Sequence, residues 1–247
     1  MSAVEIPYKF LVNATAPQRG SVTQSVTEQL RTAIVTLALK PGEILDKGAI
    51  CTRLGVSRFP VSEALARLQA EGLVEIMPQR GSMVSRVRIG DVVEYMLIRR
   101  ALESEAVRAL VAKKPAGLDG KLAANLAQQA KAAAAGDRDT FHHYDLEFHE
   151  ILFGAMQFAR IRAVIESARA NLDRARLLIL DPRRLSMTHH EHGAIAAGIA
   201  AGDADRAAAA MRAHIDKVTG ELLAFAHQSP DLFSDSERFA DGTMPFG

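Results

Sequence analysis

The sequence lacks two features that mark secreted domains and membrane spans, namely paired cysteines and long apolar runs. It has one cysteine, Cys51, and no tryptophan in 247 residues, so no disulfide can form within the chain and a reducing compartment is expected. No apolar run approaches the roughly 18 residues that a membrane helix needs, and the first residues lack the apolar core of a secretory signal. We therefore expect a cytoplasmic protein with no membrane partner and room for two hydrophobic cores.

The sequence also has no large excess of positive or negative charge. The formal net charge is +1, so binding to a polyanion would depend on a local basic surface rather than on the whole chain.

The segment 41–84 has the residues of a helix-turn-helix followed by a hairpin. Asp46 is placed to cap a helix over Lys47–Leu54, and Gly55 supplies a left-handed turn after it. Ser57 is placed to cap a second helix. The hydrophobic pattern of that helix predicts an inward stripe of Val61, Ala64, Leu65 and Leu68.

Two strands are expected after the second helix, over Leu73–Met77 and Ser82–Val87, joined by a turn at 78–81. A small helix with Arg58 at its N-terminus suits the DNA major groove, and a basic hairpin tip suits a neighbouring groove. Sequence pattern alone also permits a small packed domain without any ligand.

The rest of the chain predicts a mainly α protein. We expect a flexible arm over 1–20, a helix from Ser21 to about Leu39 that completes a winged helix-turn-helix domain over 21–88, and a mobile tail over 229–247. Between them, 91–228 reads as an antiparallel all-α bundle of about six helices. Their expected bounds are Asp91–Lys113, Leu118–Ala135, Arg138–Met156, Ala159–Leu180, Leu185–Ala201 and Ala204–Ala226.

Histidines gather in the helical region. Asp145 and His149 are four residues apart, so they share one helix face, while His192 and His214 fall on two later helices. Three imidazoles and one carboxylate would suit a borderline divalent cation, zinc first, with nickel or manganese as alternatives. Taken singly, each histidine is an ordinary surface or core residue.

The first segment resembles a known family. The motifs PGEIL, LGVSR-x-PV-x-EAL-x-RL-x-AEGLV and RG-x-x-V are similar to the DNA-binding domain of the GntR superfamily of bacterial transcription regulators. The resemblance places DNA contacts at the start of the second helix and at the hairpin tip, at Ser57, Arg58, Phe59, Ser62, Gln79, Arg80 and Gly81. Family members usually carry Arg where this chain has Ser62. A possible bidentate guanine contact is therefore missing, and the operator sequence is expected to differ.

The helical region resembles the FCD ligand-sensing domain of the FadR-type branch of these regulators. AGDRDTFHHYDLEFHEIL, EHGAIAAGIAAGDADRAAAAMRAHI and IRRALESEA carry the likeness. In its metal-containing members the ligands map here to Asp145, His149, His192 and His214, with no substitution. An acyl-CoA effector is not implied, because the member that binds acyl-CoA lacks this metal set.

Two functions follow from a metal in a helical bundle. The first is a sensor in which the metal holds a small carboxylate or hydroxy-acid effector, with cationic groups that neutralise the acid. The candidates are Arg99, Arg100, Arg169, Arg174, Arg176 and His189. The second is a hydrolase-like centre with Glu147, Glu150 or Glu191 as general base, but no catalytic motif surrounds these residues.

The DNA-binding segment favours the sensor. We expect a homodimeric regulator, a repressor rather than an enzyme, that binds an inverted repeat in double-stranded operator DNA. Val92, Met96, Leu102 and Val107 on the first bundle helix are candidates for the dimer seam.

Overall fold

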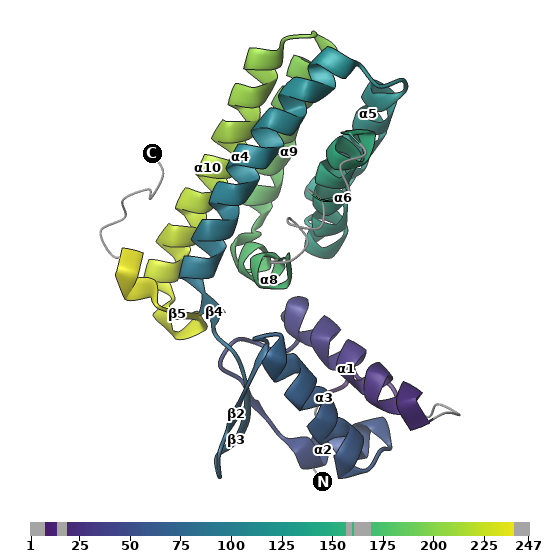
Figure 1. The fold of residues 1–247 in the computed structure, drawn as a ribbon, viewed down its shortest axis with the longest axis vertical. Coiled ribbons are helices and arrows are strands. Elements are labelled where there is room, and N and C mark those ends of the chain that lie inside the picture. The colour runs from purple at the N-terminus through teal and green to yellow at the C-terminus, as the bar shows by residue number, and fades with distance from the viewer. Residues whose placement is uncertain (1–7, 14–18, 157–159, 161–168, 240–247) are drawn as a thin grey trace. The chain divides into compact units, whose positions relative to one another are not determined.

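The fold is mainly α, as predicted (Figure 1). It is described by a computed structural model that covers residues 8–13, 19–156, 160 and 169–239. The chain divides into two compact units, Met1–Arg88 with Ser229–Ser234 and Ile89–Gln228 with Asp235–Gly247. Within the described ranges, no helix is long and apolar enough to cross a membrane.

The first unit is a winged helix-turn-helix. It contains α1 (Arg19–Val35), α2 (Lys47–Leu54) and α3 (Arg58–Ala70). Its antiparallel sheet has the order β1-β3-β2, formed by β1 (Ile44–Leu45), β2 (Val74–Met77) and β3 (Gly81–Val84).

Local chemistry explains the turn between α2 and α3. The Ala49 N–H donates to the Asp46 side chain at 3.0 Å, and Gly55 has a φ of 67°. Both features were predicted. Ser57 precedes α3 but its side chain makes no capping hydrogen bond, so the predicted role of that hydroxyl was wrong. The apolar side of α3 lies in a core of fully buried residues: Leu30, Ile34, Ile50, Leu54, Val61, Leu65 and Leu68.

Two elements of this unit end earlier than expected. Helix α1 stops at Val35 because Leu37 takes a left-handed φ of 62°. The expected strand over Ser82–Val87 is divided, since β3 stays in the sheet while β4 (Val87–Arg88) pairs in parallel with β5 (Phe233–Ser234).

The expected flexible arm over 1–20 contains a packed segment. Leu11 is fully buried, the Asp46 N–H donates to the Tyr8 hydroxyl at 2.9 Å, and Arg53 donates to the Lys9 carbonyl at 2.9 Å. Apolar and backbone contacts therefore hold residues 8–13 on the unit; residues 1–7 and 14–18 lie outside the described part.

The second unit is a bundle whose helices form a closed ring. Its members are α4 (Ile89–Lys113), α5 (Leu118–Ala135), α6 (Arg138–Met156), α9 (Pro182–Ala200) and α10 (Ala204–Gln228). Contacts run from α4 to α10, α9, α5, α6 and back to α4. Helix α8 (Arg169–Ile179) packs on α4 and α10. The expected helix over Ala159–Leu180 is described only at residue 160 and in α8.

Close packing inside the ring depends on small residues. A Cβ atom at Gly198 on α9 would lie 2.8 Å from the backbone of Ala207 on α10, so a glycine there lets the two helices approach. Three of the four candidates for the dimer seam, Val92, Met96 and Val107, are buried within this bundle instead, and Leu102 is half-buried.

The expected mobile tail also contains ordered structure. It forms η1 (Pro230–Leu232), β5 and η2 (Ser236–Phe239). The N–H groups of Ile89 and Gly90 at the start of α4 donate to the Asp235 carboxylate at 3.0 and 3.3 Å. Asp235 thus satisfies backbone donors that α4 leaves open.

Candidate functional site

Three buried imidazoles meet at the centre of the helical ring. His149 comes from α6, His192 from α9 and His214 from α10, and each offers a ligating atom within 4.8 Å of the others. These residues are between 0 and 6% exposed, so no bulk water solvates the cluster.

Each imidazole has an oxygen partner at its Nδ1 atom. His149 faces Glu103 at 2.7 Å, His192 faces Gln129 at 3.0 Å and His214 faces Glu191 at 2.8 Å. The approach of His149 Nδ1 to Glu103 is an ion-pair contact without hydrogen-bond geometry. The Nε2 atoms of the three rings are buried and have no hydrogen-bond partner among the described residues. Buried nitrogens of this kind normally have a partner, and histidine ligands usually donate from the opposite ring nitrogen to an oxygen. The cluster therefore fits a cation held by three Nε2 atoms.

Asp145 lies one helical turn before His149. Its Oδ1 atom is 3.6 Å from His192 Nε2, and its Oδ2 atom forms an ion pair of 2.5 Å with Arg176. Asp145 is outside the group whose atoms all lie within 4.8 Å, but it borders that group. Burial by itself would raise the pKa of Asp145; the nearby Arg176 and histidines outweigh burial and hold the pKa far below its ordinary value.

Two of the three histidines, His192 and His214, are held in their neutral form. Burial, followed by the neighbouring histidine, lowers the pKa of His192 and of His214 well below the ordinary value, although Asp145 acts in the opposite direction. A neutral imidazole keeps a lone pair, which is the form that binds metals.

The two carboxylates that face His149 and His214 each form an ion pair with an arginine. Glu103 pairs with Arg99 at 2.5 Å, and Glu191 pairs with Arg184 at 2.5 Å. Although burial opposes ionisation, Arg99 and His149 keep the pKa of Glu103 well below its usual range. The Glu103 carboxylate thus stays ionised beside His149.

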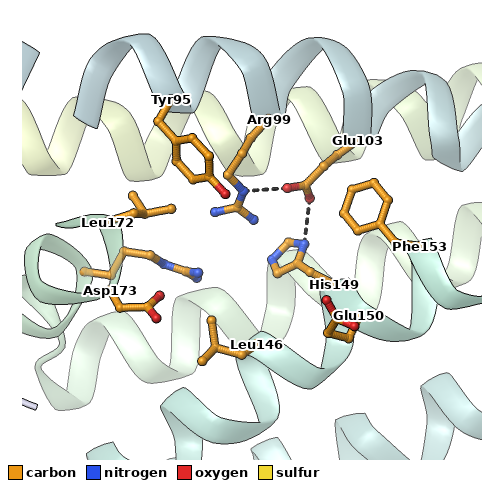
Figure 2. A pocket seen from close by; sticks show the side chains of 10 residues that line it. Tyr95, Arg99, Glu103, Leu146, His149, Glu150, Phe153, Leu172 and Asp173 are labelled. Atoms are coloured by element: carbon orange, nitrogen blue, oxygen red, sulfur yellow. Dashed lines mark hydrogen bonds and ion pairs between the residues drawn. The ribbon is translucent and has the colours of Figure 1, made fainter. Parts of the chain in front are cut away.

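A small cavity adjoins the cluster (Figure 2). Its volume is about 40 Å³, room for a few waters or a small polar group. Figure 2 shows the contacts that run from Arg99 to Glu103 and on to His149, a member of the triad. The lining residues are Tyr95, Arg99, Glu103, Leu146, His149, Glu150, Phe153, Leu172, Asp173 and Arg176.

Family comparison agrees with this architecture. Residues 22–84 match bacterial regulatory proteins of the gntR family, and residues 94–217 match the FCD domain. A Streptomyces ambofaciens protein described as an HTH-type transcriptional regulator in an unstable DNA locus is 33% identical over 210 residues, which cover 83% of this chain and 87% of the relative. The chain belongs to the GntR family of bacterial transcription regulators.

Other GntR-type proteins are similar over most of their length. The HTH-type transcriptional repressor RspR of Escherichia coli K12 is 29% identical over 228 residues, covering 91% of this chain and 97% of the repressor. A Rhodococcus sp. RHA1 protein described as a transcriptional regulator GntR shares the fold with a TM-score of 0.69 at 24% identity, covering 83% of this chain and 98% of that one.

These relatives decide the class of protein. This chain is a DNA-binding transcription regulator with an FCD domain, and the expectation that it is not an enzyme is confirmed. The three glutamates considered as general bases do not share one place. Glu191 contacts His214 and Arg184, Glu150 lines the cavity, and Glu147 is exposed.

The structure separates the cationic candidates of the FCD domain. Arg99 and Arg176 line the cavity. Arg100 instead pairs with Asp216 on α10 at 2.6 Å, because it leaves α4 on a different face from Arg99. Arg174 is fully buried, and burial lowers its pKa to about 10.

Two further candidates do not join this group. His189 is half-buried and does not line the cavity. The side chain of Arg169 lies outside the part of the chain that the structure describes.

Sequence reasoning missed the partners of the histidines. Glu103 and Gln129 were not proposed, and Glu191 was considered only as a base. The spacing of Arg99 and Glu103, four residues apart, could have indicated a shared helix face, but nothing local pointed from that face to His149.

The residues expected to contact DNA lie on the surface of the winged unit. Ser57, Arg58, Phe59 and Ser62 are exposed at the start of α3, with Phe59 75% exposed. Gln79, Arg80 and Gly81 are exposed at the hairpin tip, where Gln79 and Gly81 have φ values of 62° and 96°. A large apolar side chain that is mostly exposed suits a contact surface.

Proposed function

We propose that this regulator is a repressor whose FCD domain senses a small organic acid through a bound divalent metal ion. The observation that carries the proposal is the convergence of three buried imidazoles whose Nε2 atoms have no hydrogen-bond partner among the described residues, while Gln129 and Glu191 occupy the Nδ1 atoms of His192 and His214. His149, His192 and His214 would hold the ion, with Asp145 beside them. When bound, the ion supplies a positive centre that attracts an anionic oxygen.

Three nitrogens and one oxygen favour zinc, with nickel and manganese as alternatives. The charges around Asp145 support a cation in this position, because Arg176 places a positive group against that carboxylate. A metal ion would supply the same sign of charge to that carboxylate.

The cavity supports a small carboxylate or hydroxy acid as the effector. Arg99 and Arg176 each contribute a guanidinium group to the lining, and Leu146, Phe153 and Leu172 contribute apolar surface. Guanidinium groups bind carboxylates with paired hydrogen bonds. The volume of about 40 Å³ limits the effector to a few heavy atoms unless the lining side chains move.

The repressor acts as a homodimer on an inverted repeat in this proposal. Helix α4 exposes Leu97 and Ile98, at 44% and 39%, on a face that does not pack in its own bundle. A second copy packed on that face would place two winged units on one DNA duplex and multiply their affinities. The E. coli relative RspR is named a repressor.

The effector mechanism is tested on zinc-loaded and chelator-treated protein from one preparation. We expect stoichiometric metal after loading, and at least one acid from a panel of small carboxylic and hydroxy acids should raise the Tm of the loaded form. The same acid should weaken operator binding by the loaded form alone. Protein that binds no divalent metal, or acids that act equally on the metal-free form, would contradict the proposal.

The Arg58→Ala variant tests the DNA surface. If Arg58 meets a base edge, its loss should cost about 1–3 kcal/mol of specific binding, measured by fluorescence anisotropy on a selected operator. Arg67→Ala is the matched control, because Arg67 is exposed on the opposite face of α3. Equal losses in the two variants would contradict the placement of Arg58 in the groove.

A further inference from the structure

The Tyr144 carbonyl on α6 starts a chain of hydrogen bonds that ends at His192. A carbonyl oxygen can only accept. The side-chain N–H groups of Asn125 on α5 donate to it at 3.0 Å and to the Glu147 carboxylate at 2.8 Å. The nitrogen end of the Asn125 amide is therefore fixed, and its oxygen faces the other way.

Gln129 lies one turn further along α5, and its contact with Asn125 fixes the orientation of its own side-chain amide. Its side-chain N–H groups donate to Asn125 Oδ1 at 2.7 Å and to the Tyr144 carbonyl at 3.4 Å. Only the Gln129 oxygen is left to face His192, and it lies 3.0 Å from Nδ1. Gln129 is fully buried, so no water competes for that position.

An amide oxygen cannot donate, so the proton of this contact belongs to His192 Nδ1. In a neutral imidazole the lone pair is then on Nε2, the buried atom that has no hydrogen-bond partner among the described residues. The Phe148 ring stacks on His192 at 4.1 Å with an angle of 4° between the planes. Stacking fixes the plane of the imidazole but not which edge faces the other histidines.

We infer that Gln129, oriented by Asn125, is a positioning residue that selects the Nδ1-protonated tautomer and the ring flip of His192 before any metal binds. The inference rests on the proposed function in that His192 serves as a metal ligand. It adds a distinct physical role, since the other two rings face the carboxyl groups of Glu103 and Glu191, whereas Gln129 holds this one with a neutral amide.

The tautomer is measured in the metal-free, full-length protein by long-range ¹H–¹⁵N NMR of labelled histidine, with His192→Ala to assign the signals. Wild-type His192 should show a protonated Nδ1. In Gln129→Met, which keeps the side-chain length but removes the acceptor, His192 should populate the other tautomer, and the zinc Kd should rise about 10–100-fold.

Three further variants keep this test decisive. Gln128→Met, on the neighbouring half-buried glutamine of α5, should leave the tautomer and the zinc Kd unchanged. Gln129→Glu retains an acceptor for Nδ1 and should preserve the wild-type tautomer. Asn125→Ala leaves Gln129 in place without its orienting partner and should weaken zinc binding. This variant carries the test if circular dichroism shows that Gln129→Met does not fold.

An unchanged His192 tautomer and zinc Kd in folded Gln129→Met would overturn the inference. A wild-type protein that binds no divalent metal would instead contradict the proposed function. Because the tautomer is read without metal, the two failures are distinguishable.

Discussion

A His192→Ala variant is expected to bind zinc more than about 100-fold more weakly than the wild-type protein, since even the hydrogen-bond partners of metal ligands are worth about 10–100-fold. His192 is fully buried and lies beside both other histidines, with ring centroids 5.2 Å from His149 and 4.7 Å from His214. Its loss removes one nitrogen from a set of three. The effector response should be lost with the metal.

Operator binding without effector should persist in this variant, because the winged unit has its own core. Zinc affinity is measured by competition with a chromophoric chelator, and operator affinity by anisotropy on the same samples. His190→Ala provides the control, since His190 is exposed two residues earlier on α9. Wild-type zinc affinity or effector response in His192→Ala would rule out the proposed site.

An Arg176→Met variant should lower the free energy of unfolding of the metal-free protein by about 3–5 kcal/mol at neutral pH. Removing one partner of a buried ion pair leaves an uncompensated charge, which costs about that much. The charge in question is Asp145, 2% exposed and 2.5 Å from Arg176. Urea denaturation of chelator-treated protein measures the loss.

The loss should depend on pH in a defined direction. In the wild-type protein the folded pKa of Asp145 is depressed, so its stabilising effect is present above the unfolded pKa of about 3.9 and declines as pH falls further. Without Arg176, burial raises the folded pKa of Asp145. Acidification then protonates Asp145 and removes the buried charge, which stabilises the variant. The difference in unfolding free energy between the wild-type protein and Arg176→Met should therefore become smaller as the pH falls from 7 to about 4.

Two comparisons check the physical cause. Arg183→Met removes the same charge from a side chain that is 75% exposed and should change stability little. Zinc should restore part of the stability of Arg176→Met, because a cation again faces Asp145. A loss that does not change with pH or zinc would show that Arg176 acts through packing alone.

Much of the secondary structure could be predicted because its causes are local. The expected bounds of Lys47–Leu54, Leu118–Ala135 and Arg138–Met156 are those observed. Asp46 and Gly55 delimit the first of these helices through a cap and a left-handed turn, and Gly136, with a φ of 65°, ends the second. Such groups act on backbone donors and acceptors within a few residues.

Sequence spacing also determined which chemistry the helical unit carries. Two residues four apart must share a helix face, so Asp145 and His149 were paired before any packing was known. His192 and His214 were proposed from their places on two later helices, and the likeness to the FCD domain supported all four residues. The structure brings the four to one buried place. The spacing did not indicate which side chain contacts the Nδ1 atom of each histidine.

Tertiary structure alone decided those partners and the cavity. Glu103, Gln129 and Glu191 contact His149, His192 and His214 because five helices close into a ring. The same closure directs Arg99 to the cavity and the adjacent Arg100 to Asp216. A polar residue on a helix has the same sequence context whether it meets water or a buried imidazole. Only the long-range packing of one helix on another determines which of the two it meets.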